Sequence, residues 1–142
     1  MSTPQTVNIS HDFALPVERV YAYLAEHEHL GPLFGATITR LRDGDTSRNG
    51  AGSVRRLKVG PLPAFEETVT EAVDNTRIGY RISKGSPLRN HRGVMEFRPV
   101  GTGCHLDYRI EFDSAVPGLG PLVRLGLERT LRRGLRTVDA KA

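Results

Sequence analysis

Residues 103–138 read GCHLDYRIEFDSAVPGLGPLVRLGLERTLRRGLRTV, and the hydropathy period changes once within this stretch. In its first part Leu106, Tyr108, Ile110 and Phe112 alternate with polar residues, which is the period of two typical of a strand with one buried face. In its second part apolar residues recur at helical spacing and arginines occupy the other side. The apolar stripe comprises Leu122, Val123, Leu127, Thr130, Leu131, Leu135 and Val138. The stretch therefore predicts a strand followed by a long amphipathic helix.

Six further runs with strand character precede this stretch. They cover residues 7–13, 37–42, 53–59, 65–73, 77–84 and 90–98. Gly, Pro, Asn and Asp residues separate the last five of them at a spacing of about 8 to 12 residues, which predicts an antiparallel meander.

The segment between the first two runs has a helical period. Val17, Val20 and Leu24 recur on one face after Pro16, which favours an amphipathic helix that ends near Glu28. Gly31 and Pro32 then interrupt the helix, and a further short turn follows up to Phe34. We expect two short helices with a break between them.

Composition limits the functions that this chain can have. Its 142 residues are typical of a single domain spanning 1–142, and no apolar run approaches the roughly 18 residues of a membrane-spanning helix. The net charge of +4 is mild, and we expect no nucleic-acid partner. Cys104 is the only cysteine, which excludes an intrachain disulfide and a cysteine-based zinc site. Residues 1–10 lack a basic segment followed by an apolar core, so we expect a cytoplasmic location.

The order of elements predicts an α+β fold in which a seven-stranded, curved antiparallel sheet wraps around a long C-terminal helix. One helix about 10 Å across cannot cover such a sheet completely. The sequence has no Trp, five Phe and four Tyr, so bulky side chains that could fill the remainder are scarce. This shortage favours a cavity between the sheet and the helix.

Three segments carry a resemblance to a known family. They are Leu-Pro-Val-Glu-Arg-Val-Tyr-Ala-Tyr-Leu at 15–24, Glu-Thr-Val-Thr-Glu at 67–71 and Ile-Gly-Tyr-Arg-Ile at 78–82. With the basic final helix, they resemble the START and birch-pollen-allergen-like superfamily, in particular its polyketide cyclase/dehydrase and lipid-transport branch. The resemblance covers nearly the whole chain and implies a helix-grip fold with an apolar cavity for lipids, polyketides, sterols or hormones. Its motifs are mostly structural, so they specify the fold better than the chemistry.

Ten residues are the candidates for lining this cavity. They are Glu67, Tyr80, Ile82, His91, Met95, Phe97, Tyr108, Ile110, Leu122 and Leu127. The alternative is an ordinary packed core at the same positions. A binding pocket of this kind is mostly apolar and carries a few polar groups that orient the ligand.

Glu67 and His91 are the two ionisable members of this set. Each is in phase with apolar neighbours of its own strand, and an inward ionisable group is costly unless it is paired. The alternative is that each lies at a strand end and reaches solvent. The resemblance places one strand between theirs, a gap of roughly 10 Å, so we do not expect them to pair directly as a catalytic dyad unless a ligand lies between them. No catalytic residue, metal or cofactor is predicted.

Three other features have a functional and a plain interpretation. His27 and His29 could begin a metal site, but no third ligand is near, and a solvated helix end fits better. The segment Gly44–Gly52 lacks the Gly-Lys-Ser/Thr ending of a phosphate-binding loop, so nucleotide binding is disfavoured. It fits either a mobile rim of the cavity or a plain hairpin loop. Arg124, Arg129, Arg132, Arg133 and Arg136 give the last helix a basic side. These arginines either keep a surface helix in contact with solvent and complement its dipole, or they make peripheral contact with an anionic membrane.

Three functions are compatible with this sequence. The first is binding or transport of a small hydrophobic molecule, lipid or polyketide-like. The second is a polyketide aromatase/cyclase or dehydratase in which Glu67, His91 or Tyr108 would move protons. The third is a module that binds another protein through the basic helix or the outer sheet face. The sequence favours them in that order.

Overall fold

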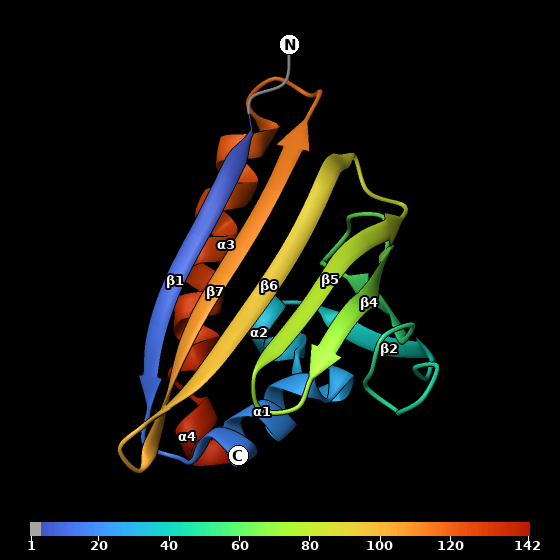
Figure 1. The fold of residues 1–142 in the computed structure, drawn as a ribbon. Coiled ribbons are helices and arrows are strands. Elements are labelled where there is room, and N and C mark those ends of the chain that lie inside the picture. Colours follow the sequence, from blue (N-terminus) through green and yellow to red (C-terminus); the bar gives the residue numbers. More distant parts are fainter. Residues whose placement is uncertain (1–3) are drawn as a thin grey trace.

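A computed structural model of the chain describes residues 4–142. Its elements are β1 (Gln5–Phe13), α1 (Val17–Ala25), the 3₁₀ turn η1 (His27–His29), α2 (Gly31–Phe34), β2 (Thr37–Arg42), β3 (Val54–Lys58), β4 (Phe65–Val73), β5 (Arg77–Lys84), β6 (Leu88–Val100), β7 (Gly103–Ser114), α3 (Leu119–Leu135) and α4 (Val138–Lys141). Figure 1 shows α3 lying along one face of a curved sheet, with α1 near the lower end of that sheet.

The sheet is a seven-stranded antiparallel sheet with the order β1-β7-β6-β5-β4-β3-β2. The strands from β2 to β7 form a meander, and β1 joins the far side of β7 with Ile9 opposite Tyr108. The meander and the seven strands are confirmed, because tight turns after short alternating runs leave each strand beside its predecessor. The long helix and the short helices between β1 and β2 complete the predicted α+β, helix-grip architecture.

The short helices differ in detail from the prediction. Pro16 is the N-cap of α1, and α1 ends at Ala25 rather than near Glu28. Gly31 and Pro32 begin α2 instead of only interrupting a helix, because proline is tolerated in a first turn where its missing amide has no partner. Gly35 ends α2 in the left-handed conformation that glycine adopts without strain.

The C-terminal helix also ends earlier than the sequence pattern indicates. α3 stops at Leu135, and Val138 belongs to the separate helix α4. Gly134 is buried against α2, where a Cβ would lie 2.8 Å from Cα of Leu33. The absence of a side chain at this position therefore brings the two helices into close contact.

The apolar core lies between α3, α1 and the half of the sheet formed by β1, β7 and the adjoining part of β6. We call this region the apolar half. Its fully buried side chains include Val7, Leu106, Ile110, Leu131 and Leu135. α3 contacts β1, β7 and α2, so the helix covers the sheet on this side.

The C-terminal segment fastens the corner between β1 and α1. The carboxylate of Asp139 accepts hydrogen bonds from the backbone amides of Ala14 and Leu15, at distances between 3.0 and 3.2 Å. The guanidinium of Arg19 donates to the backbone carbonyl of Ala142. Segments about 125 residues apart in sequence thus meet at one corner.

Candidate functional site

An arginine–glutamate pair lies buried on the inner face of the sheet. Arg55 of β3 and Glu67 of β4 are directly opposite in the strand register, and only 2% and 4% of these residues are exposed. Nε of Arg55 donates a hydrogen bond of 2.9 Å to Oε1 of Glu67. Nη2 of Arg55 is 2.8 Å from the same oxygen but is not aligned for a hydrogen bond, and among the described residues it has no hydrogen-bond partner. Nη2 of Arg55 thus contacts the carboxylate as a charge, and its N–H groups form no aligned hydrogen bond.

Aromatic rings enclose the guanidinium of this arginine. Cζ of Arg55 lies 4.9 Å from the ring centroid of Tyr80 and 5.8 Å from that of Phe34, which are cation–π distances. Tyr80 has room because its neighbour on β6 is Gly93, where a Cβ would lie 2.3 Å from the tyrosine Cζ. Glycine at this position holds the Tyr80 ring flat across the inner face.

Two tyrosine hydroxyls meet beside the ion pair. The hydroxyls of Tyr80 and Tyr108 share a short hydrogen bond, and their rings form an edge contact with centroids 6.4 Å apart. Burial raises the pKa of both tyrosines far above the ordinary value, so both are protonated at neutral pH. Burial also raises the pKa of Glu67, and the charge and hydrogen bond of Arg55 oppose that rise.

A β-bulge positions His91. The register between β6 and β7 shifts between Arg89 and Arg92, and Asn90 has a positive φ of 52°. Nδ1 of His91 accepts a hydrogen bond of 3.0 Å from the backbone amide of Ile82, and burial lowers the pKa of His91 to about 4. The ring is therefore neutral at pH 7, and its proton resides on Nε2.

These residues form one group, which we call the inner polar cluster: Arg55, Glu67, Tyr80, His91 and Tyr108. Its hydrogen-bond donors outnumber the acceptors that they meet. Nη2 of Arg55 has no partner among the described residues, and Nε2 of His91 carries a proton. In the tyrosine pair, whichever hydroxyl accepts keeps its own proton to donate. An acceptor oxygen placed among these groups would satisfy donors that the protein leaves open.

The other predicted lining residues occupy different environments. Met95, Phe97 and Ile110 are buried in the core, and Ile82 and Leu127 are partly buried. Leu122 is 68% exposed, so the prediction that it lines the inner wall is wrong. Successive helical residues are about 100° apart, and the buried face of α3 passes through Gly120, Leu131 and Leu135, on the far side from Leu122.

Among residues 4–142 the structure has a small hollow and a larger groove, and neither is lined by a predicted ligand residue. The first, of about 10 Å³, lies where α1, η1 and α2 meet α3 and α4, and it has room for about one water molecule. The second is a groove of about 230 Å³ on the outer face of the sheet. Its lining residues are Glu71, Arg77, Arg92, Val94, Glu96, Arg109 and Glu111. The cavity between the sheet and α3 stays a prediction.

His27 is buried, and its predicted place at a solvated helix end is wrong. It is 0% exposed, and its Nε2 donates to Oγ of Ser53, which in turn donates to the carbonyl of Gly50. Burial, together with the charges of Arg55 and Arg40, lowers the pKa of His27 to about 3. Its role in the structure is to tie η1 to the loop between β2 and β3.

A second set of contacts holds the same loop, Gly44–Gly52. The guanidinium of Arg40 binds the carboxylates of Glu26 and Glu28 at 2.9 Å. It also donates to the side-chain carbonyl of Asn49 and to the backbone carbonyl of Arg48. The loop is thus anchored to η1 by charge as well as by the buried histidine.

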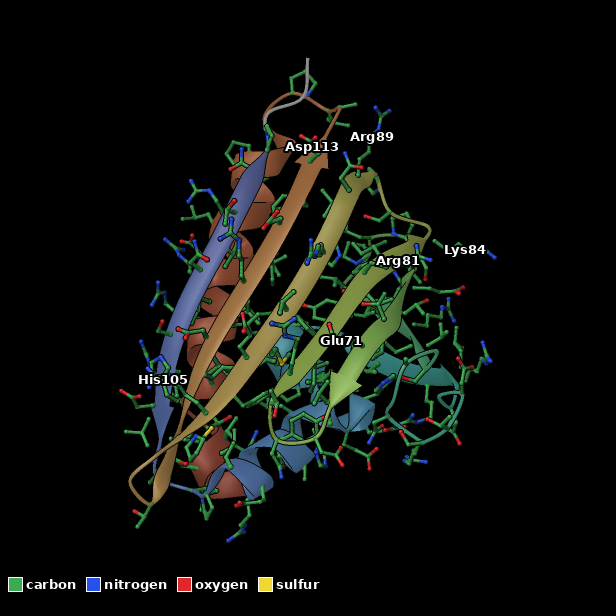
Figure 2. All side chains as sticks on the ribbon, viewed as in Figure 1. Glu71, Arg81, Lys84, Arg89, His105 and Asp113 are labelled. Atoms are coloured by element: carbon green, nitrogen blue, oxygen red, sulfur yellow. The ribbon has the colours of Figure 1, made fainter. Side chains whose placement is uncertain are left out.

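The outer face of the sheet carries mainly charged side chains. Figure 2 shows Glu71, Arg81 and His105 on this face, away from α3. His105 has Asp12 2.6 Å from Nδ1 and Asp107 3.2 Å from Nε2. These hydrogen bonds raise its pKa above the ordinary value. Within residues 4–142, no group of three or more His, Cys, Asp or Glu side chains has the arrangement of a metal site.

Sequence reasoning missed Arg55, although a signal was present. Arg55 is in phase with Leu57 and Ser53, both of which are buried, so the alternation of β3 places its side chain inward. Two buried opposite charges on neighbouring strands explain how Glu67 can face inward. The partner of the inward carboxylate thus lies on β3 rather than on the strand of His91.

The chain matches the model of the family described as polyketide cyclase / dehydrase and lipid transport over residues 4–142. No curated protein matches it at a significant level.

Solved structures with the same fold are distant in sequence. A START superfamily protein from Mycobacterium smegmatis is 17% identical, with a TM-score of 0.77 over 96% of this chain and 95% of that chain. Norcoclaurine synthase from Thalictrum flavum is 12% identical, with a TM-score of 0.75 over 99% and 96%. Ara h 8.0201 is 11% identical, with a TM-score of 0.71 over 97% of each chain. At these identities the likeness concerns the fold.

Proposed function

This chain belongs to the polyketide cyclase/dehydrase and lipid transport family, and we propose that it binds or carries a small hydrophobic molecule, lipid or polyketide-like, between the sheet and α3. The inner polar cluster would receive the polar end of that molecule. Apolar surface removed from water would supply most of the affinity, at about 25 cal/mol per Å².

The observation that carries this proposal is the buried Arg55–Glu67 pair, in which Nη2 of Arg55 contacts the carboxylate at 2.8 Å without an aligned hydrogen bond. A buried ion pair often stabilises a fold no better than apolar side chains of similar size, so its presence calls for another role. Arg55, the tyrosine pair and His91 lie near one another and all carry hydrogen-bond donors, as expected of a pocket that orients a ligand.

The charges of the cluster indicate which polar end it would accept. Arg55 and Glu67 balance each other when both are ionised, so a carboxylate ligand would bring an uncompensated buried charge. A neutral carbonyl oxygen accepts hydrogen bonds without that cost. We therefore expect an apolar ligand with a neutral carbonyl oxygen at its buried end.

The first experiment is native mass spectrometry of the protein purified from cells. A retained small apolar molecule is the expected result. A second measurement compares 2-acetylnaphthalene with 2-ethylnaphthalene, which differ in one carbonyl oxygen. We expect the ketone to bind about tenfold more tightly, and Tyr108→Phe to reduce this preference.

Tyr21→Phe is the matched control, because Tyr21 is also buried but contacts Phe97 in the apolar core. It should leave the ketone preference unchanged. No retained molecule together with no binding of either naphthalene would contradict the proposed function.

Acid–base catalysis on a polyketide-like substrate is the second candidate. The observation in its favour is Glu67, a buried carboxyl with a raised pKa beside two hydroxyls and a neutral His91. The double variant Glu67→Gln/His91→Gln should abolish cyclisation of a poly-β-keto thioester, followed by absorbance of the aromatic product. Unchanged cyclisation would remove both residues from the mechanism.

A further inference from the structure

The solvent-facing side of α3 combines positive charge with exposed leucines. The exposed residues of α3 and of its C-cap Arg136, which we call the α3 outer face, are Pro121, Leu122, Leu125, Gly126, Arg129, Arg132, Arg133 and Arg136. We propose that this face docks onto an anionic lipid bilayer. The inference goes beyond the proposed function, because docking requires neither a bound ligand nor a cavity.

The arginines of this face are available for an external partner. Within the described residues, none of the four forms an ion pair or a side-chain hydrogen bond, whereas Arg124 on the same helix is paired with Glu128 at 3.3 Å. Glu128 is partly buried and is not a member of the outer face. The face therefore presents four positive charges and no negative one. Anionic headgroups attract such residues, each of which strengthens binding by about fivefold.

The leucines distinguish a membrane from other anionic partners. Leu122 and Leu125 are 68% and 47% exposed and lie in the first half of α3, before the first arginine of the face. Val116 in the preceding loop is 50% exposed. Apolar and cationic residues on the same face are typical of helices that lie in the bilayer interface. A nucleic acid would contact the arginines but would leave the leucines in water.

The geometry suggests how the helix would lie. Leu122 and Leu125 would enter the boundary between headgroups and acyl chains, and the arginines of the later turns would contact phosphates. Peripheral attachment is the mode that fits, since no helix among residues 4–142 has the length and apolar content to cross a bilayer.

Vesicle sedimentation at low salt tests the charge requirement. The full chain is mixed with vesicles of phosphatidylcholine alone or of phosphatidylcholine with phosphatidylglycerol. We expect binding only to the anionic vesicles and a loss of binding near 0.5 M salt, where charges are strongly screened. The variant R129Q/R132Q/R133Q/R136Q should bind at least a hundredfold more weakly.

The matched control changes the same number of charges elsewhere. R81Q/R89Q/R92Q/R98Q removes four exposed arginines from the outer face of the sheet and gives the same net charge. This control should keep most of the binding to anionic vesicles. Equal losses in the two variants would show that net charge alone is responsible and would overturn the proposal.

A second pair of variants tests the leucines. Leu122→Ser/Leu125→Ser should weaken binding by about tenfold or more, since each leucine loses apolar burial. Val73→Ser/Val100→Ser removes two valines of similar exposure at hairpins and should have no effect. Far-UV circular dichroism confirms that each variant is folded. Docking onto a bilayer would be overturned if Leu122→Ser/Leu125→Ser bound the anionic vesicles as tightly as the wild type. It would also be overturned if the protein bound a DNA duplex more tightly than the anionic vesicles.

Discussion

Both halves of the sheet bury side chains on the inner face, but in one of them the buried side chains include charges. In the apolar half, α3 covers β1 and β7, and residues such as Val7, Ile110 and Leu131 are almost fully buried. In the half formed by β3, β4 and β5, which we call the polar half, the buried residues include the charged Arg55 and Glu67 as well as apolar residues such as Val69. Apolar packing stabilises a fold without selecting a ligand, whereas enclosed charges cost solvation. The comparison indicates that packing in the apolar half maintains the fold, whereas the charges enclosed on β3 and β4 are held at a cost in solvation.

The largest expected effect comes from breaking the charge pair of the polar half. Glu67→Leu leaves the Arg55 guanidinium buried without its carboxylate, so we expect a loss of about 3–5 kcal/mol in the free energy of unfolding. Arg55→Met/Glu67→Leu removes both charges and should recover most of that loss. Urea denaturation of the two variants and the wild type measures both effects. If Glu67→Leu were as stable as the wild type, the buried Arg55 guanidinium would not depend on the Glu67 carboxylate.

A substitution in the apolar half sharpens the contrast. Leu131→Ala should cost about 2–5 kcal/mol, because it leaves a cavity under α3. Adding Arg55→Met/Glu67→Leu to this variant should not restore stability, since Leu131 lies on α3 and the charge pair on β3 and β4. Restoration in the triple variant would mean that the two halves are energetically coupled.

Acid should destabilise the protein through its buried histidines. The unfolded chain binds a proton at each histidine near pH 6.5, whereas the folded chain keeps His27 neutral down to about pH 3 and His91 down to about pH 4. Because the unfolded state binds more protons in this window, stability falls as the pH falls from 6.5 toward 3. Between pH 7 and pH 4, the wild type should lose on the order of 3 kcal/mol more than His27→Gln.

His27→Gln isolates the effect of titration, because glutamine keeps a hydrogen-bond donor at this position. The glutamine amide can donate to Ser53 as Nε2 of His27 does, but it does not titrate. Denaturation curves at several pH values give the two profiles. Parallel profiles would show that His27 is not the source of acid sensitivity.

Two glycines provide a smaller and more local test. Gly93→Ala places a Cβ 2.3 Å from Cζ of Tyr80, so the ring must move, at a cost of about 1–3 kcal/mol. Gly126→Ala in α3 meets nothing within 4 Å and should raise stability by roughly 0.5–1 kcal/mol. Thermal unfolding measures both. If Gly93→Ala were tolerated as well as Gly126→Ala, Tyr80 would not be fixed across the inner face.

The smallest effect is expected on the outer face, at His105. Its folded pKa is raised, so its contribution to stability is complete below pH 6.5 and disappears as the pH rises through the folded pKa. Surface pairs of this kind contribute less than about 1 kcal/mol. His105→Gln should therefore be slightly destabilising at pH 5.5 and neutral at pH 9, as measured by urea denaturation. A large effect at pH 9 would point to packing instead of charge.

The apolar half could be predicted from the sequence, and the polar half only in part. Period-two alternation located all seven strands, because one buried face forces that pattern on β7 and its neighbours. The inward orientation of Glu67 followed from the same parity. Its pairing with Arg55 was missed, since an arginine in a strand ordinarily indicates a solvent-facing position.

Other features depended on contacts that no local pattern contains. His27 is buried because Ser53, 26 residues later, lies against it. The bulge at Asn90 that positions His91 exists only through the pairing of β6 with β7. In α3, leucines lie on both sides of the helix, so the stripe alone did not show that Leu122 faces solvent.

The pairing of β1 with β7 constrains how the protein folds during translation. β1 is made early, but its partner in the register is made about 100 residues later, and the amides after β1 meet Asp139 later still. On the ribosome, an early amphipathic strand must therefore remain without its partner while the meander is synthesised. We expect such a chain to depend on chaperones or rapid elongation more than a protein whose neighbouring strands are all consecutive.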